Sequence, residues 1–176
     1  MASDLTWLRS HLRDIPDFPS AGVTFKDITP LLGSATALQA AVDAIADAWA
    51  GEPIDRVAGI EARGFLLAAP VAYRLGTALI PIRKPGKLPW EVVEQSYELE
   101  YGIDTIEAHR DAAAEGERVL IVDDVLATGG TAAAACALLE GLGAEVVGVG
   151  VLIELGFLDG RARLDGREVR SVLLEA

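Results

Sequence analysis

At 176 residues the chain is long enough to bury one sizeable core, and its 51% hydrophobic and 24% charged residues are ordinary for a folded α/β protein. Its 15 basic and 27 acidic residues give a formal net charge of −12, which disfavours nonspecific binding to nucleic acid or to an anionic membrane. No apolar run approaches the roughly 18 residues of a membrane span, and the first residues lack the pattern of a secretory signal. We therefore expect a single domain over residues 1–176 in the cytoplasm.

The positive mean hydropathy of +0.32 indicates more buried surface than a monomer needs, so we expect a homodimer. The single Cys136 cannot form an internal disulfide. It falls in an alanine-rich stretch, where a small buried thiol is expected rather than a catalytic one.

The chain begins with a helical pattern followed by a turn-rich segment. Leu5, Leu8 and Leu12 are spaced as on one helix face, and Pro16 ends the pattern, which predicts an amphipathic helix over residues 4–15. Residues 18–32 are too rich in turn formers for a core element, yet they contain two phenylalanines. Loops of this kind often carry function.

Helical and strand patterns then alternate. We expect a helix over residues 36–50, a buried strand over 56–60, a helix over 65–75 and a strand over 77–82. This order predicts a doubly wound, mainly parallel sheet flanked by helices, with right-handed crossovers. Arg63 lies in the first strand-to-helix turn, where a cation could neutralise an anionic group. The alternative is a surface arginine in a salt bridge.

Residues 83–90 hold three cations among prolines and a glycine in an otherwise acidic chain. A mobile basic loop that closes over an anion explains this composition, and a solvated loop is the alternative. Residues 96–102 then alternate like a strand, with Glu98 and Glu100 on one side, and a further strand is expected over 103–109.

Residues 119–131 combine an apolar strand, two aspartates, a glycine-rich turn and the start of a helix expected over 131–142. Gly129 and Gly130 allow a close backbone approach, so the turn is typical of a phosphate site. Asp123 and Asp124 would repel a phosphate unless they contact sugar hydroxyls or a bound Mg²⁺. The alternative is a plain strand end followed by a capped turn. Neither a Walker loop nor a dinucleotide fingerprint occurs here.

The last part of the chain proposes no chemistry by itself. A long strand is expected over residues 145–155, a partly helical connection over 156–164 and an edge strand over 167–174.

The central stretch closely resembles the signature of the type I phosphoribosyltransferases, which bind 5-phosphoribosyl-1-pyrophosphate (PRPP) through it. Its Asp-Asp-x-Leu-Ala-Thr-Gly-Gly-Thr pattern is similar to the adenine-specific branch. The resemblance implies that Asp123 and Asp124 lie at the ribose hydroxyls. It places the 5-phosphate on Ala127, Thr128, Gly129, Gly130 and Thr131.

Other motifs extend the resemblance from Phe18 to Leu155. The loop Pro-x-x-Gly-Val-x-Phe-x-Asp-Ile-x-Pro resembles the adenine-binding loop of that branch, which implies adenine contacts from Thr24, Phe25 and Lys26. Lys26 stands where many relatives have arginine. Leu155, in a Glu-Leu pair like the Val-Glu-Leu of the family, would contact the face of the base.

For the pyrophosphate the resemblance implies Arg63 together with Arg83, Lys84 and Lys87 of a flexible hood loop over residues 83–101, some acting across a dimer interface. It implies catalytic roles for Glu100, Arg63 and Tyr101, while residues 1–35 form the N-terminal helix and base-binding loop. The expected metal is Mg²⁺, held mainly through PRPP and near Asp123 and Asp124.

The implied activity is adenine + PRPP → AMP + pyrophosphate, in purine salvage. Two alternatives remain: a phosphoribosyltransferase for another base, such as hypoxanthine-guanine, xanthine or orotate, and a PRPP-sensing regulator. The regulator would need a basic surface or domain for nucleic acid, and the charge of −12 does not support one. We therefore expect small-molecule partners, with neither nucleic acid nor membrane among them.

Overall fold

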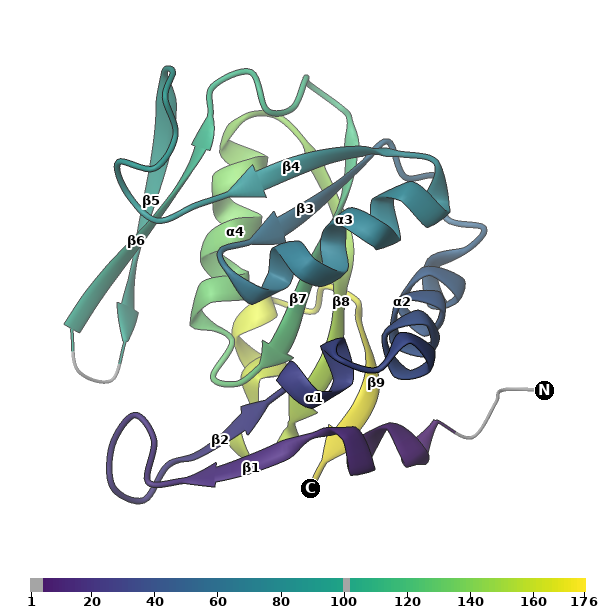
Figure 1. Ribbon diagram of the computed structural model, residues 1–176. Helices are drawn as coiled ribbons and strands as arrows, with labels where there is room; N and C mark the ends of the chain where they lie inside the picture. The colour runs from purple at the N-terminus through teal and green to yellow at the C-terminus, as the bar shows by residue number, and fades with distance from the viewer. Residues whose placement is uncertain (1–4, 100–101) are drawn as a thin grey trace.

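The computed structural model describes residues 5–99 and 102–176 and has a five-stranded parallel sheet at its centre (Figure 1). The strand order is β4 (Ala78–Ile82), β3 (Arg56–Ile60), β7 (Arg118–Leu126), β8 (Glu145–Leu155) and β9 (Val169–Glu175). The chain moves outward from β3 to β4 and later continues from β7 on the opposite side of β3. The direction of winding therefore changes between β3 and β7, where the carboxyl ends of the strands create a crevice for ligands.

Helices cover both faces of this sheet. Helices α2 (Ala35–Trp49) and α3 (Arg63–Leu75) lie on one face, and α4 (Gly130–Gly141) lies on the other (Figure 1). Alternate side chains of β7 serve the two cores, since Leu120 packs with α2 and α3 whereas Ile121 packs with α4. The predicted doubly wound fold is confirmed. Cys136 of α4 is buried, and burial raises the pKa of its thiol to about 11.

The N-terminal prediction is wrong beyond His11. A 3-10 helix, η1 (Thr6–His11), takes up only part of the expected helix, and β1 (Arg13–Pro16) follows it. This strand pairs antiparallel with β2 (Thr24–Asp27), so that Ile15 lies opposite Phe25. The backbone hydrogen bonds to β2 outweigh the local helical pattern, because both strands come from one short hairpin. A short helix, α1 (Thr29–Leu32), then leads into α2.

A second hairpin, β5 (Val92–Leu99) and β6 (Gly102–His109), stands beside the sheet (Figure 1). Strand β5 begins four residues before the predicted start at Ser96. The segment expected as a hood loop over 83–101 is thus a turn followed by a strand in its described part. Two 3-10 helices, η2 (Gly156–Leu158) and η3 (Gly160–Leu164), confirm a partly helical connection before β9, which lies at the sheet edge as predicted.

Within residues 5–99 and 102–176, no helix is both long and apolar enough to cross a bilayer.

Candidate active site

A cavity of about 420 Å³ opens at the carboxyl ends of β3 and β7. Both hairpins contribute to its wall, since Thr24 and Phe25 come from β2 whereas Tyr97 comes from β5. It brings together most of the predicted site residues. These are Thr24, Phe25, Lys26, Arg63, Lys84, Asp123, Asp124, Ala127, Thr128, Gly129, Gly130, Thr131 and Leu155.

Four predicted residues are not placed there. Arg83 and Lys87 are described but do not line the cavity. Glu100 and Tyr101 lie outside the described residues, so their expected catalytic roles stay predictions.

The glycine-rich turn between β7 and α4 has the left-handed backbone that its sequence predicts. Gly129 has a φ of 81° and caps α4, which begins at Gly130. A Cβ at position 129 would collide with the carbonyl oxygen of Gly160 in η3, so the close approach at this glycine is to the protein's own backbone. Gly130, Thr131 and Ala132, the first residues of α4, line the cavity. The N–H groups in the first turn of a helix have no partner within the helix, which makes this end suited to a phosphate.

The two aspartates at the end of β7 are enclosed by protein and have few hydrogen-bond donors. Asp124 is only 4% exposed, and Arg63 Nε lies 2.9 Å from its Oδ2. Asp123 Oδ1 accepts a hydrogen bond from the Asp124 N–H at 2.9 Å. Among the described residues no group makes a well-aligned hydrogen bond to Asp124 Oδ2 or to Arg63 Nη1.

This enclosure changes the acidity of both carboxyl groups. Burial raises the pKa of Asp123 well above its ordinary value, and the neighbouring Asp124 charge raises it further. Burial also raises the pKa of Asp124, although the Arg63 guanidinium opposes the shift. The Asp123 carboxylate has one backbone donor and Asp124 Oδ2 has no aligned one, so the pair retains acceptor capacity that a ligand could use.

The predicted base-binding side has one aromatic and one aliphatic wall. The Arg63 guanidinium carbon lies 4.5 Å from the centroid of the Phe25 ring, and the Phe18 ring meets Phe25 edge-on at 5.2 Å. The Lys26 ammonium lies 2.8 Å from Asp14 Oδ1 and 3.6 Å from Glu175 Oε2. The hydrogen bond that the Lys26 ammonium donates to Asp14 raises the pKa of Lys26, although burial opposes the shift, so this cation is already paired inside the fold.

Lys84 faces a polar network on the β5–β6 hairpin. Its Nζ contacts Asp104 and lies 3.3 Å from the Tyr97 hydroxyl, which donates to Asp104 Oδ2 at 2.9 Å. The Thr131 hydroxyl donates to the same Tyr97 oxygen at 3.1 Å. The network thus links the predicted phosphate turn to the predicted pyrophosphate side. Burial lowers the pKa of Lys84, but its Asp104 and Tyr97 partners raise it by more.

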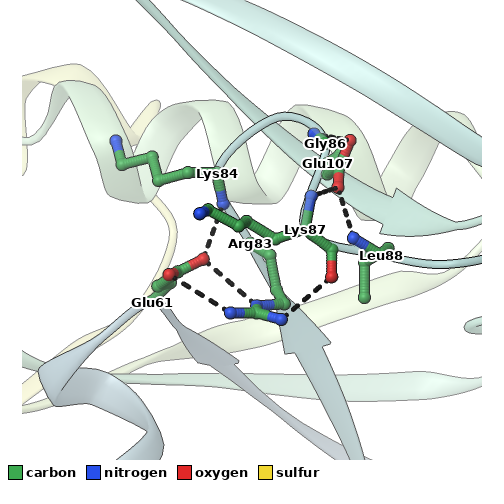
Figure 2. Close-up of polar contacts among 7 residues, drawn as sticks. All are labelled: Glu61, Arg83, Lys84, Gly86, Lys87, Leu88 and Glu107. Atoms are coloured by element: carbon green, nitrogen blue, oxygen red, sulfur yellow. Dashed lines mark hydrogen bonds and ion pairs between the residues drawn. The ribbon is translucent and has the colours of Figure 1, made fainter.

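Sequence reasoning missed Tyr97, Asp104, Glu61 and Glu107 as site or supporting residues. Tyr97 and Asp104 are directly opposite in the hairpin register, so the pairing of the two strands would have placed them together. Glu61 and Glu107 hold the turn that carries Arg83 and Lys84 (Figure 2). No local sequence signal marks those two glutamates, because their partners lie about 20 residues away.

The family model described as the phosphoribosyl transferase domain matches residues 27–170. The chain belongs to the phosphoribosyl transferase family. Among curated members, the adenine phosphoribosyltransferase of Thermobifida fusca is 57% identical over 173 residues, covering 98% of each protein. That of Frankia casuarinae is 61% identical over 166 residues, covering 94% of this chain and 88% of the relative.

Solved phosphoribosyl transferase structures agree. The adenine phosphoribosyltransferase of Thermoanaerobacter pseudethanolicus has a TM-score of 0.95 and 51% identity, covering 97% of this chain and 99% of that one. The Saccharomyces cerevisiae enzyme, in complex with an imino-altritol bisphosphate and adenine, has a TM-score of 0.91 and 40% identity over 98% and 100%. The predicted family, its adenine-specific branch and the pentosyltransferase class are confirmed.

Proposed function

We propose that this cavity transfers the 5-phosphoribosyl group of PRPP to adenine, giving AMP and pyrophosphate in purine salvage. The observation that carries the proposal is the assembly of four unlike features in one cavity: a glycine-rich turn at a helix N-terminus, a pair of aspartates with few donors, a cationic side and a flat apolar side. A nucleotide and its pyrophosphate leaving group contain the matching parts. The relatives named above carry the same activity in their names.

The phosphate and ribose would bind at the end of β7. The backbone N–H groups of residues 127–131 and the positive end of α4 suit the 5-phosphate. Asp123 and Asp124 would accept hydrogen bonds from the ribose hydroxyls, and at Asp124 Oδ2 the hydroxyl would supply an aligned donor that no described residue supplies.

Mg²⁺ fits this site as a partner of PRPP rather than as a resident of a protein cage. Within the described residues no three metal-ligating side chains cluster, so PRPP oxygens would supply most of its ligands. Asp124 Oδ2, which lacks an aligned hydrogen bond, is a protein oxygen that could contact the ion or its waters. When bound, Mg²⁺ neutralises charge on the departing pyrophosphate.

Charge grows on both sides of the breaking C1–O bond, because the ribose gains oxocarbenium character while pyrophosphate leaves. Arg63, Lys84 and Lys26 are cations on the cavity wall. Arg63 and Lys84 could stabilise the leaving group, whereas Lys26 lies on the proposed adenine side and is paired with Asp14. Glu100 and Tyr101 would act on the opposite side, with Glu100 orienting adenine or accepting its proton.

Adenine would lie between Phe25 and Leu155, with Thr24 and Lys26 reading its edge through their backbone. Adenine presents an amino donor and a ring-nitrogen acceptor where 6-oxo purines present the reverse. A matching backbone edge leaves unpaired buried groups against hypoxanthine or guanine, a mismatch that can cost roughly 10⁴-fold in rate.

A homodimer is the proposed assembly, and a single domain over residues 1–176 in the cytoplasm remains our prediction. Three large apolar side chains support a second copy on the α3–β4 side: Leu66 is 50% exposed, Tyr73 90% and Leu79 41%. Arg83 and Lys87 lie on the same chain segment as Lys84, and their expected pyrophosphate contacts stay predictions.

One assay tests the function. The protein is mixed with PRPP, Mg²⁺ and each of adenine, hypoxanthine, guanine, xanthine and orotate, and nucleotide formation is read by chromatography. We expect AMP from adenine and at least a thousandfold lower rates with the other bases. Comparable use of hypoxanthine would contradict the adenine assignment, and PRPP binding without any nucleotide product would favour the regulator.

A further inference from the structure

Glu61 carries a carboxylate on the wall of a cavity proposed to bind a highly anionic substrate. It follows β3 directly and lies two residues before Arg63. An acidic side chain at this place should repel pyrophosphate unless its charge serves another purpose. Its hydrogen bonds show what that purpose is.

The Glu61 carboxylate binds the exit of β4. Its Oε2 accepts the Lys84 backbone N–H at 2.9 Å, and the Arg83 guanidinium donates to both of its oxygens at 3.2 and 3.3 Å (Figure 2). The Lys84 N–H lowers the pKa of Glu61, and the Arg83 contact lowers it further against an opposing effect of burial. The carboxylate is therefore ionised and its donors are fixed.

Arg83 does not line the cavity, and its guanidinium is engaged by protein acceptors. Its Nη1 donates to the Lys87 carbonyl oxygen at 2.9 Å, and its backbone exchanges two hydrogen bonds with Glu107. The buried Glu107 carboxylate accepts the N–H groups of Gly86, Lys87 and Leu88 at 2.9–3.1 Å (Figure 2). The Arg83–Leu88 turn is thus anchored at both ends.

We propose that Glu61 is a positioning residue that fixes the β4 exit against the Arg63 turn, so that Arg63 and Lys84 face the same pyrophosphate. Arg83 acts through Glu61 instead of touching the substrate. This inference rests on the proposed function, since it requires PRPP in the cavity. The two predicted hood residues would then have different roles: Lys84 would contact the substrate, and Arg83 would hold Glu61 in place.

The direction in which one substitution changes PRPP affinity distinguishes a positioning role of Glu61 from simple charge repulsion. Removing a negative charge beside an anion site should strengthen anion binding if the charge only repels. Under the proposal, Glu61→Ala weakens Mg–PRPP and pyrophosphate binding about tenfold in calorimetric titration, because Lys84 loses its placement. AMP affinity should stay within about twofold, since AMP has no pyrophosphate. Glu61→Gln, which keeps an acceptor for the Lys84 N–H, should lose less.

Matched variants sharpen the test. Glu94→Gln removes one charge from an exposed carboxylate on β5 that forms no hydrogen bond or ion pair with any described residue, and it should leave all three affinities unchanged. Arg83→Ala should match Glu61→Ala, and the double variant should be no worse than either, because both break one contact. If Glu61→Ala fails to fold by circular dichroism, Glu61→Gln and Arg83→Lys provide the same comparison.

Three results would overturn the inference: tighter PRPP binding by Glu61→Ala, equal losses of AMP and PRPP affinity, or additive losses in the double variant. The last would show that Arg83 contacts pyrophosphate itself. The proposed function fails separately, by absence of PRPP binding in the unmodified protein.

Discussion

Two pairs of carboxylates lie near the carboxyl ends of the parallel strands and differ in how many hydrogen-bond donors surround them. Asp123 and Asp124, at the end of β7, are enclosed and short of donors, and burial raises both pKa values. Glu61 and Glu107, at the Arg83–Leu88 turn, are saturated with N–H groups (Figure 2). Burial raises the pKa of Glu107, but three backbone donors lower it by more.

This contrast distinguishes binding from support. A buried carboxylate that the protein satisfies contributes to stability, and its loss leaves backbone N–H groups unpaired. A buried carboxylate that the protein leaves unsatisfied destabilises the free fold and becomes useful only when a ligand brings donors. The first kind should affect melting, and substrate affinity only indirectly, through the placement of the residues that it holds. The second kind should affect substrate affinity directly.

The largest effect is expected at the turn that follows the aspartates. Gly129→Ala forces a side chain into a φ of 81° and into the Gly160 carbonyl, so it should cost about 2 to 5 kcal/mol of stability and abolish PRPP binding. Urea unfolding with a PRPP titration checks both. Gly116→Ala is the matched control, because Gly116 has a φ of 77° with no atom within 4 Å of its added Cβ, and it should cost about 1 kcal/mol. Equal costs at the two positions would mean that η3 does not brace the turn.

Asp124→Asn should reduce PRPP affinity about 10- to 100-fold, since hydrogen bonds to a charged group contribute roughly 1.5 to 3 kcal/mol. The Arg63 contact would also weaken, because its Nε lies 2.9 Å from the carboxylate. Titration calorimetry with Mg²⁺ present measures the loss. An affinity within threefold of the unmodified protein would remove Asp124 from the ribose site.

Asp123→Asn should stabilise the ligand-free protein, on the order of 1 kcal/mol or about 2–4 °C in Tm at pH 7, because it removes a buried charge beside Asp124. The pKa of Asp123 is raised in the folded protein. Its ionisation therefore does not destabilise the fold below the unfolded pKa near 3.8, destabilises it increasingly as the pH rises toward the folded pKa, and does so fully above that value. The advantage of the variant should therefore grow with pH and vanish in acid. A melting difference that grows toward acid would reverse this assignment.

The smallest effect is expected at the base. Phe25→Ala removes one stacking face, worth about 0.5 to 1.5 kcal/mol, so the KM for adenine should rise roughly 2- to 13-fold. Selectivity against hypoxanthine should persist, because the backbone edge remains. Initial rates with adenine and hypoxanthine measure both effects. Loss of selectivity in the variant would show that the Phe25 ring, rather than the backbone, discriminates between the bases.

Much of the fold could be predicted from local pattern. The apolar runs of β3, β7 and β8 are short, buried and separated by helical patterns. Their assignment as strands of a parallel sheet could therefore be predicted from the sequence. The segment from Arg13 to Pro16 could not be predicted in this way, because its strand exists only through pairing with β2. The helical spacing of Leu5, Leu8 and Leu12 contains no information about the pairing with β2.

Within the candidate site, the glycine-rich turn and the aspartate pair could be predicted from the sequence to lie together, but their surroundings could not. Sequence reasoning attributed the glycine at 129 to a ligand's approach, whereas the atom that excludes a side chain there belongs to Gly160. It treated Arg83, Lys84 and Lys87 as equivalent cations, although long-range contacts to Glu61, Asp104 and Glu107 give the three residues different environments. Charge composition identifies a basic segment, and only tertiary contacts decide which partner each cation binds.

The most direct measurement compares one carboxylate from each pair. Asp123→Asn and Glu107→Gln each remove a single negative charge, and both variants are melted without ligand and titrated with Mg–PRPP. We predict that Asp123→Asn loses PRPP affinity at least tenfold while its Tm does not fall, and that Glu107→Gln loses several degrees in Tm while its affinity falls by less. The reverse pattern, or parallel losses in both variants, would contradict the distinction between ligand-binding and supporting carboxylates.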